Sequence, residues 1–479
     1  MSLFHLIHLI QCNHGSETNQ QILNNEELIF RAILSQIIIH PLKNFFLSEK
    51  TMANTTNGMT ATEYIIAQHA KRDRVKPGEI VNVSVDLCMS NDATTLLTEK
   101  IIKEQMKTQK LWDPDRVIII VDHQVPADSV DTSIVQQQMA LFVDEQGIKN
   151  FHTTDGVCHQ VMLEKYVYPG ALILGADSHT CSYGSIGSVS SGIGSTDLAA
   201  IWASGETWLK VPETIRFILN GTLQPDVSAK DVALHIINLV RANGLTYKTM
   251  ELAGPGVTSL TVPQRFTICN MAVEAGAKST MVIPDQSVIE FFETLGRPFI
   301  NVSLIENLQK TQHSPCHSEI QIHLNELTPQ IACPHYVDNV RPLSEVQGLK
   351  MDQAFLGSCT NGRIEDLREG AHLLKGKRIA SNMKLLVTPA SLRVYKQALD
   401  ENLIPIFLDA GAIVNHPGCS TCWGAHQGIL APGQRMVTTG NRNFKGRAGS
   451  PDSEIYLASP SVVVASAIKG ELTHPKEVR

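Results

Sequence analysis

From Thr60 onward, hydrophobic and polar positions alternate between two periods along the chain. Stretches with helical spacing, such as TTLLTEKIIKEQMKTQ at 94–109, are followed by short β-branched runs such as RVIIIV at 116–121. An amphipathic helix buries a stripe of residues three or four apart, whereas a strand buried on both faces is almost continuously apolar. This alternation predicts an α/β fold with a largely parallel sheet.

Four of the apolar runs lead directly into polar, chemically reactive loops. The pairs are RVIIIV and DHQVP, ALILG and ADSHTCSYG, QAFLG and SCTNGR, and RMVTTG and NRNFKGR. Open α/β sheets bind ligands beyond the carboxyl ends of their strands. The repetition predicts that several sheets converge on one cleft lined by these loops.

The first fifty residues follow a different pattern, rich in Ile, Leu, Asn and Gln. Their apolar runs are interrupted by polar residues and fall short of the ~20 residues that a membrane span needs. They also lack the basic start, apolar block and cleavage site of a signal peptide. We interpret them as a loosely organised extension or, preferably, as residues upstream of a true start at Met52. No membrane segment is expected.

Composition narrows the class of protein. The 479 residues, 43% of them hydrophobic, suffice for two to four domains. A net charge of −7 argues weakly against nucleic-acid binding, which favours basic surfaces. Ten cysteines without a secretory signal indicate reduced thiols in the cytoplasm and leave room for a metal site.

Three of the cysteines stand in loops suited to metal binding. The segment NHPGCSTCWG carries Cys419 and Cys422, and GSCTNG places Cys359 between a strand and an expected helix, where a thiolate is favoured. The C-x-x-C alone is consistent with half a zinc site, a redox dithiol, a structural role or chance. The sequence holds no second C-x-x-C to complete a zinc site, and a thioredoxin-type dithiol would need its own strand-to-helix context. The other cysteines are not expected to be ligands: Cys12, Cys88, Cys158, Cys181, Cys269, Cys316 and Cys333.

Histidines and acids follow the same buried strands. Asp122 adjoins His123, His159 lies in DGVCHQ, and Asp177 precedes His179 in GADSHT. A carboxylate fixes the tautomer of a neighbouring histidine and raises its basicity, which suits proton transfer. A single histidine is more often structural, but its position after a strand and beside an acid favours a catalytic role.

The loop NRNFKGR offers Asn441, Arg442 and Arg447 for anion binding. Arginine matches carboxylates in bidentate geometry, although an isolated pair of arginines also fits a solvated basic loop. The glycine-rich stretch at 183–197 lacks the full dinucleotide fingerprint. We expect it to let backbone pass close to the cleft.

The motifs FLGSCTNGRIEDL, PGCSTCWG, GADSHT and TGNRNFKGR together resemble the aconitase superfamily, most closely the shorter large subunits of 3-isopropylmalate dehydratase and homoaconitase. The resemblance covers Thr60 to the C-terminus. It implies three α/β/α domains, at 60–212, 213–322 and 323–479, around a central Fe–S cleft after an extension at 1–59. It also implies a [4Fe–4S] cluster held by Cys359, Cys419 and Cys422, with one iron open to substrate, unlike the four-thiolate clusters of electron transfer.

The resemblance also assigns roles to side chains. The catalytic residues that it implies form three acid–histidine pairs: Asp122 with His123, Asp177 with His159, and Glu251 with His179. The residues that it places against substrate are Asn91, Ser178, Asn441, Arg442 and Arg447. Asn91 stands where aconitases proper have glutamine.

The implied function is the large subunit of a hydro-lyase that converts 2-isopropylmalate to 3-isopropylmalate in leucine biosynthesis. Homoaconitate hydratase and 2,3-dimethylmalate dehydratase are alternatives within the same chemistry. Other classes are an Fe–S regulatory protein that binds RNA, which the net acidity disfavours, and a zinc-stabilised structural protein. The chain stops before the mobile swivel domain of long aconitases, so the resemblance implies a small subunit with the base serine and a distal arginine, in a heterodimer or a dimer of heterodimers.

Overall fold

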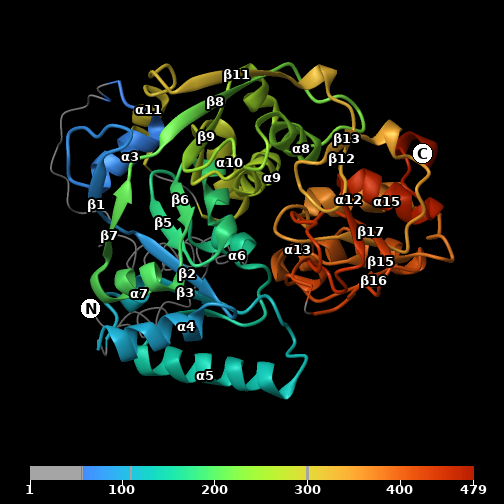
Figure 1. The fold of residues 1–479 in the computed structure, drawn as a ribbon, viewed down its shortest axis with the longest axis horizontal. Coiled ribbons are helices and arrows are strands. Elements are labelled where there is room, and N and C mark those ends of the chain that lie inside the picture. The colour runs from blue at the N-terminus through green and yellow to red at the C-terminus, as the bar shows by residue number, and fades with distance from the viewer. Residues whose placement is uncertain (1–55, 57, 108–109, 298–300, 425) are drawn as a thin grey trace, which may run out of the picture. The chain divides into compact units, whose positions relative to one another are not determined.

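The structure is a computed structural model that describes residues 56, 58–107, 110–297, 301–424 and 426–479. The expectations for the first 51 residues, including the start at Met52, lie outside the described residues. The chain from Thr56 to Arg479 forms one compact unit. It contains helices and mostly parallel strands, which confirms the predicted α/β class (Figure 1).

A five-stranded parallel sheet lies in the first part of the chain. Its strands, in spatial order, are β4 (Asn150–His152), β3 (Val117–Ile120), β2 (Leu87–Asn91), β5 (Leu172–Gly175) and β6 (Val189–Gly192). The helices of this part are α3 (Ala61–His69), α4 (Thr95–Lys100), α5 (Val130–Gln146), α6 (Cys158–Lys165) and α7 (Ser195–Ser204). Every residue of β2, β3 and β5 is buried, and the continuous apolar runs of β3 and β5 predict this.

A second, four-stranded parallel sheet follows. Its order is β10 (Ser279–Val282), β9 (Lys248–Ala253), β8 (Glu213–Asn220) and β11 (Ser318–His323). Its helices are α8 (Ala229–Val240), α9 (Val262–Met271), α10 (Gln286–Thr294) and α11 (Val302–Gln309). Capping boxes built on Ser228 and Thr261 satisfy the first N–H groups of α8 and α9, so both helices begin at sharply defined residues.

A seven-stranded sheet completes the fold. Its order is β13 (Val340–Pro342), β12 (Gln330–Ala332), β18 (Glu454–Leu457), β17 (Arg435–Thr438), β14 (Gln353–Leu356), β15 (Lys384–Val387) and β16 (Ile413–Val414). The strands from β18 to β16 are parallel, and β12 and β13 join antiparallel at one edge. Its helices are α12 (Ile364–Leu374), α13 (Leu392–Asp400), α14 (Leu403–Asp409) and α15 (Pro460–Lys469).

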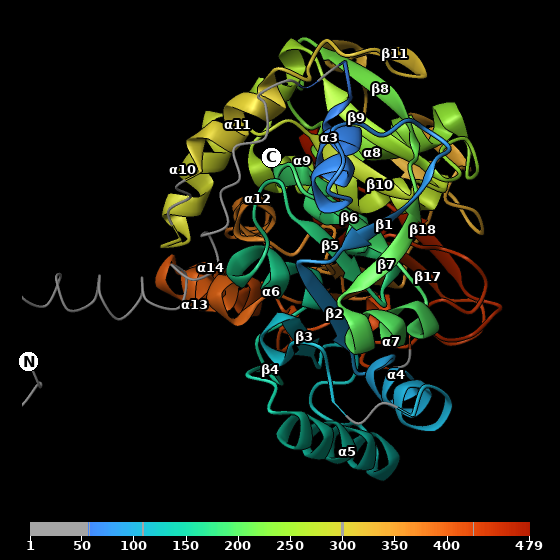
Figure 2. The same ribbon diagram turned by 90° about the vertical axis from the view of Figure 1, so that its left-hand side faces the viewer.

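A short antiparallel ribbon lies outside these three sheets. β1 (Ile80–Ser84) pairs with β7 (Glu206–Lys210), from Ile80 opposite Lys210 to Ser84 opposite Glu206. Figure 2 shows the blue β1 beside the green β7, so the two ends of the first predicted segment meet here. Among the helices that the structure describes, none combines the length and apolar character that crossing a bilayer demands.

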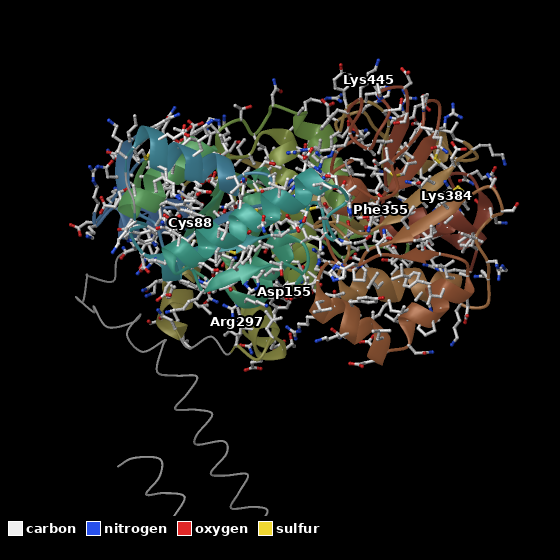
Figure 3. All side chains as sticks on the ribbon, turned by 90° about the horizontal axis from the view of Figure 1, so that it is seen from below. Cys88, Asp155, Arg297, Phe355, Lys384 and Lys445 are labelled. Atoms are coloured by element: carbon white, nitrogen blue, oxygen red, sulfur yellow. The ribbon has the colours of Figure 1, made fainter. Side chains whose placement is uncertain are left out.

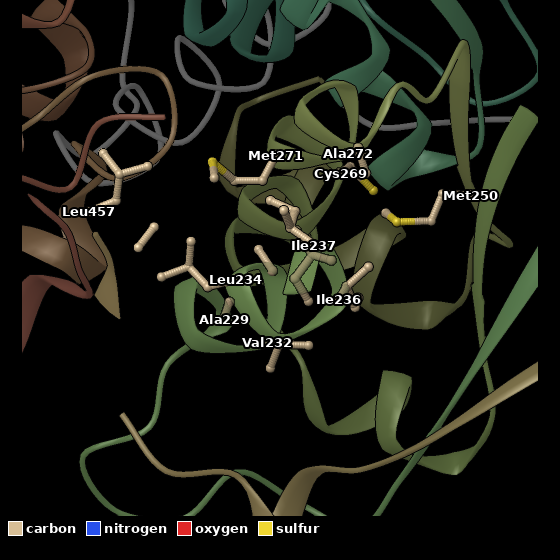
Figure 4. Close-up of a cluster of buried hydrophobic side chains, with 14 of the residues drawn as sticks. Ala229, Val232, Leu234, Ile236, Ile237, Met250, Cys269, Met271, Ala272 and Leu457 are labelled. Atoms are coloured by element: carbon tan, nitrogen blue, oxygen red, sulfur yellow. The ribbon is translucent and has the colours of Figure 1, made fainter. Parts of the chain in front are cut away.

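The hydrophobic cores cross the predicted domain boundaries. One cluster joins Ile237 of α8 and Met271 of α9 to Leu457 of β18, and Figure 4 shows Leu457 on the side of Leu234 and Met271. Another joins Ile118 of β3 to Phe266 of α9. Each predicted range builds its own sheet, with β11 ending one residue past the boundary at 322. The division into three domains stays a prediction, because the sheets share their cores.

Two predicted segments differ in detail from the structure. The stretch 94–109 forms α4 and then a wider turn over Ile101–Gln105 instead of one continuous helix. The glycine-rich stretch forms a 3-10 helix (Ser178–Ile186) and β6, and a Cβ atom added at Gly192 would lie only 2.8 Å from the carbonyl oxygen of Asp177. Glycine is therefore required here for close backbone packing, as the sequence predicts.

Candidate active site

One cavity lies where the carboxyl ends of β3, β5, β14 and β17 deliver their loops. Its empty volume, including the open mouth, is about 440 Å³. The residues that line it are Asp122, His123, Val157, Cys158, His159, Asp177, His179, Cys359, Cys419, Cys422, Trp423, Asn441, Arg442 and Arg447. All four predicted strand-end loops contribute, which confirms that they meet at one cleft.

The three predicted cysteine ligands reach this cavity from two segments. Cys359 follows β14, whereas Cys419 is the N-cap and Cys422 the last residue of a single 3-10 turn. The side-chain amide of Asn270 in α9 donates to Cys359 Sγ at 3.3 Å, and that of Asn441 donates to the same sulfur at 3.4 Å. The amide oxygen of Asn441 lies 3.5 Å from Cys422 Sγ. A single asparagine thus links the two loops that carry the thiols.

The local setting of Cys359 differs from the expected helix N-terminus. Helix α12 begins at Ile364 with Arg363 as its N-cap, so Cys359 precedes the cap by four residues. The Arg363 guanidinium instead donates to the Cys359 carbonyl at 2.9 Å and fixes the turn. Burial, followed by the neighbouring Cys422, raises the pKa of the Cys359 thiol to about 12. A thiolate here therefore requires a bound cation or metal to stabilise it.

The spacing of the sulfurs discriminates between kinds of metal centre. A single zinc ion with bonds of about 2.3 Å would draw its sulfurs to within about 3.8 Å of one another. Among the described residues, the groups whose ligand atoms all lie within 4.8 Å are Asp122–His123–Cys419 and His159–Asp177–His179, and the three cysteines are not such a group. Thiols spread around a cavity, with N–H donors directed at their sulfurs, fit a multi-iron cluster better than one zinc ion.

His123 lies between two carboxylates. Its Nδ1 is 2.8 Å from Asp122 Oδ1 and 3.0 Å from Asp92 Oδ1. Burial alone would lower the pKa of His123, but the two carboxylates outweigh it and hold the pKa well above its usual value. Asp122 also accepts from the backbone N–H of Cys158 at 2.7 Å, which ties this loop to α6. His123 is therefore a buried histidine at the cavity whose two acidic neighbours favour its protonated form.

A second group joins His159 and Asp177. His159 Nε2 lies 2.8 Å from Asp177 Oδ1, the pairing that the resemblance implies, and His159 Nδ1 lies 3.0 Å from the Tyr183 hydroxyl. Burial would raise the pKa of Asp177, but His159 and His179 hold it well below its usual value. The Asn91 amide approaches Asp177 Oδ2 at 3.5 Å without lining the cavity.

The predicted partner of His179 is wrong. His179 Nε2 lies 3.2 Å from Glu274, not Glu251. Glu251 is fully buried in β9 and pairs with Arg216 at 2.5 Å, away from the cavity lining. Both glutamates follow GLTYKTM in the sequence, and only the three-dimensional fold distinguishes Glu274, in the 3-10 helix Ala272–Ala275 after α9, from Glu251 inside β9.

The arginines of the 441–447 loop are held by the site. Arg442 Nε binds Glu274 at 2.8 Å and its Nη2 donates to the Ser178 hydroxyl at 2.8 Å. Arg447 lies over the ring of Trp423, and its Nη2 is 3.8 Å from Cys422 Sγ. Lys445 of the same loop stands at the outer edge of the protein in Figure 3. The solvated-loop interpretation is therefore wrong for both arginines.

Comparison with known proteins follows this geometry. The model of the aconitase family (aconitate hydratase) matches residues 63–470. The chain belongs to the aconitase family. A probable 3-isopropylmalate dehydratase large subunit from Methanothermobacter thermautotrophicus is 45% identical over 425 residues, covering 88% of this chain and all of that protein. The 3-isopropylmalate dehydratase large subunit 1 of Archaeoglobus fulgidus is 45% identical, with 88% and 99% covered.

Another aconitase-family relative carries a different name. A probable methanogen homoaconitase large subunit from Methanothermobacter thermautotrophicus is 43% identical, covering 88% of this chain and 98% of that protein. Among solved structures, Thermococcus kodakaraensis aconitase X (holo-form) covers 84% of this chain and 97% of that one, with 12% identity and a TM-score of 0.46. A likeness this weak contributes nothing to the assignment of residues.

Sequence reasoning missed three polar residues at the aconitase-family site. Asp92 directly follows Asn91 and accepts from the backbone N–H groups of His123 and Gln124. Glu274 stands alone as an acid in the apolar stretch ICNMAVEAGA, and Asn270 lies in the same stretch. Two polar residues within an otherwise apolar run of sequence were the signal that could have identified Asn270 and Glu274.

Proposed function

We propose that this chain is the cluster-bearing large subunit of a hydro-lyase that isomerises 2-isopropylmalate to 3-isopropylmalate in leucine biosynthesis. The observation that carries the proposal is a single cavity lined by three cysteine thiols, Arg442 and three histidines, each of which has a carboxylate partner. The names of relatives at 45% identity support the choice of substrate.

Cys359, Cys419 and Cys422 would hold a [4Fe–4S] cluster in this cavity. When bound, such a cluster supplies a Lewis acid that polarises the hydroxyl and an adjacent carboxylate of the substrate. The amide N–H groups of Asn270 and Asn441 suit this role, since they already donate to the Cys359 sulfur. Hydrogen bonds to sulfur are one means by which a protein tunes such a cluster.

The histidines of the cavity would carry out proton transfer. Asp122 and Asp92 both contact Nδ1 of His123 and favour its protonated form, so the ring is suited to donate a proton to a departing hydroxide. Asp177 stays ionised between His159 and His179 and orients both rings. Arg442 and Arg447 carry the positive charge for the substrate carboxylates, with Ser178 and Glu274 holding the Arg442 guanidinium in place.

The proposal includes a small subunit, which the name "large subunit" of the relatives supports. By the resemblance, it would carry the swivel domain with the base serine and the distal arginine, and would work with this chain in the cytoplasm. Neither nucleic acid nor a membrane enters the proposed function.

The test is co-expression of the chain with a candidate small subunit, anaerobic purification, and assay. We expect iron and sulfide in near-equal amounts, and turnover of 2-isopropylmalate above that of homoaconitate and 2,3-dimethylmalate. Zinc without sulfide would overturn the cluster assignment. Turnover of homoaconitate alone would favour the second candidate, which the homoaconitase relative at 43% identity supports.

A further inference from the structure

Lys230 is a fully buried lysine that the proposed chemistry does not use. It lies in the first turn of α8, directly after the N-cap Ser228 and Ala229, and its side chain is fully buried. Its ammonium group donates to the backbone carbonyl of Thr439 at 2.9 Å and to that of Gly440. The helix that carries Lys230 belongs to the four-stranded sheet, whereas Thr439 and Gly440 directly follow β17 of the seven-stranded sheet.

This location is unfavourable for a lysine in two respects. The positive end of the helix dipole lies at the first turn, where a cation is destabilised. Burial of an ammonium group is also costly, and it lowers the pKa of Lys230 to about 7, against the opposing influence of Cys422, Cys359, Asp231 and Glu274. Asp231 cannot serve as its main partner, because its carboxylate is occupied by the backbone N–H groups of Ser228 and Gln330.

The two carbonyls that Lys230 binds belong to the turn that builds the site. Gly440 is followed directly by Asn441, which links the Cys359 and Cys422 sulfurs, and by Arg442, which lies on Ser178 and Glu274. The hydroxyl of Thr439 accepts from the backbone N–H of Gly357 at 2.9 Å, so the same turn also braces the segment that leads to Cys359.

We propose that Lys230 is a positioning residue: it clamps the Thr439–Gly440 turn from the adjoining sheet and so holds Asn441 against the cysteine sulfurs and Arg442 at the substrate position. Without the clamp, two backbone carbonyls lose their buried donor and the turn gains freedom. The role in turnover rests on the proposed function, whereas the clamp itself does not.

The experiment compares Lys230→Met with Lys377→Met in the full chain. Lys377 is a matched control because it also donates to two backbone carbonyls, those of Leu373 and Val478, and it does not line the cavity. Hydrogen exchange of the peptide covering 435–447 is measured first, since it requires neither cluster nor turnover. We expect exchange at 439–442 to accelerate at least tenfold in Lys230→Met and to stay unchanged in Lys377→Met.

The second readout uses the enzyme loaded with its cluster and paired with its small subunit. Lys230→Met should raise the KM for substrate about tenfold or more, change kcat less, and alter the electron paramagnetic resonance signal of the cluster. Lys230→Arg, which keeps a charged donor, should restore part of the KM. Lys377→Met should match the wild type in all three measurements.

Equal exchange rates and equal KM values for Lys230→Met and Lys377→Met would overturn the proposal. If Lys230→Met does not fold, Lys230→Gln takes its place, and wild-type exchange at 439–442 in that variant would overturn the proposal as well. A wild-type protein without isomerase activity would refute the proposed function alone, because the exchange measurement still tests the clamp.

Discussion

Glu274 and Glu251 lie 23 positions apart, and both are acids buried next to an arginine, yet they belong to different kinds of site. Glu274 lies behind the cavity lining, between His179 and Arg442, and these partners lower its pKa although burial would raise it. Glu251 lies inside the four-stranded sheet against Arg216, and burial outweighs that partner and raises its pKa. An acid kept ionised at a cavity can orient a catalytic histidine, whereas the Glu251–Arg216 pair stabilises the packing of a sheet.

The largest expected effect is the loss of the cluster when a cysteine of the cavity, rather than one elsewhere, is replaced. Cys359→Ser should abolish the cluster, because two thiolates cannot hold it in place of three. The control is Cys333→Ser, since Cys333 is equally buried at 7% exposure but does not line the cavity. Iron, sulfide and visible absorbance are measured after anaerobic purification, and an unchanged spectrum in Cys359→Ser would refute the ligand assignment.

The next largest expected effect is a loss of turnover without a loss of the cluster. His123→Ala removes the protonated ring between Asp122 and Asp92, so turnover should fall by roughly 10²–10⁴-fold while the cluster remains. The measurement is kcat of the enzyme paired with its small subunit, together with cluster absorbance. Wild-type turnover in this variant would exclude His123 as a proton donor.

The structural role of the Glu251–Arg216 pair is tested by measuring the free energy of unfolding. Arg216→Met leaves Glu251 buried without its ion-pair partner, so the free energy of unfolding should fall by about 3–5 kcal/mol. Arg368→Met breaks an exposed pair with Glu401 and should cost less than about 1 kcal/mol. Urea unfolding of the full chain measures both values, and equal losses would mean that the buried pair contributes no more than a surface one.

A smaller effect contrasts the two glutamates directly. Glu274→Gln should lower kcat/KM by roughly 10–100-fold, as expected for a group that orients an active side chain from behind. Glu251→Gln should leave kcat/KM of the folded enzyme close to the wild-type value. If Glu251→Gln lowered activity as much as Glu274→Gln, the structural assignment of Glu251 would be wrong.

The smallest effect is a difference in pH dependence. Glu274 has a lowered folded-state pKa, so the stability that it contributes is present above 4.5 and is lost as pH falls below that value. Glu251 has a raised folded-state pKa, so stability is present below 4.5 and declines as pH rises through the folded value. Urea midpoints of the wild type, Glu274→Gln and Glu251→Gln between pH 3.5 and 6.5 should therefore diverge in opposite directions.

Much of the fold was readable from local pattern. The continuous apolar runs predicted β3, β5, β14 and β17, and the polar residues directly after them predicted the cavity, because strand ends in a parallel sheet lie at one edge. The three cysteines followed from loop chemistry and resemblance. The domain boundaries were less readable, since side chains such as Leu457 pack across them.

The acid partners were not readable from local pattern. His179 and Glu274 are 95 residues apart, and the sequence offers several acids at comparable separations. Glu251 stands next to LAGPG, a turn motif typical of functional loops, yet its side chain pairs with Arg216, which lies directly opposite on the neighbouring strand β8. Asp92 was overlooked since its role depends on backbone N–H groups that a sequence does not display.

The shared core around Leu457 affects how the protein responds to proteolysis. Because α8 and α9 bury their apolar faces partly against β17 and β18, a protease that cuts between the second and third sheets would expose apolar surface on both products. Neither fragment would keep its native packing, so limited digestion should give either the intact chain or extensive degradation.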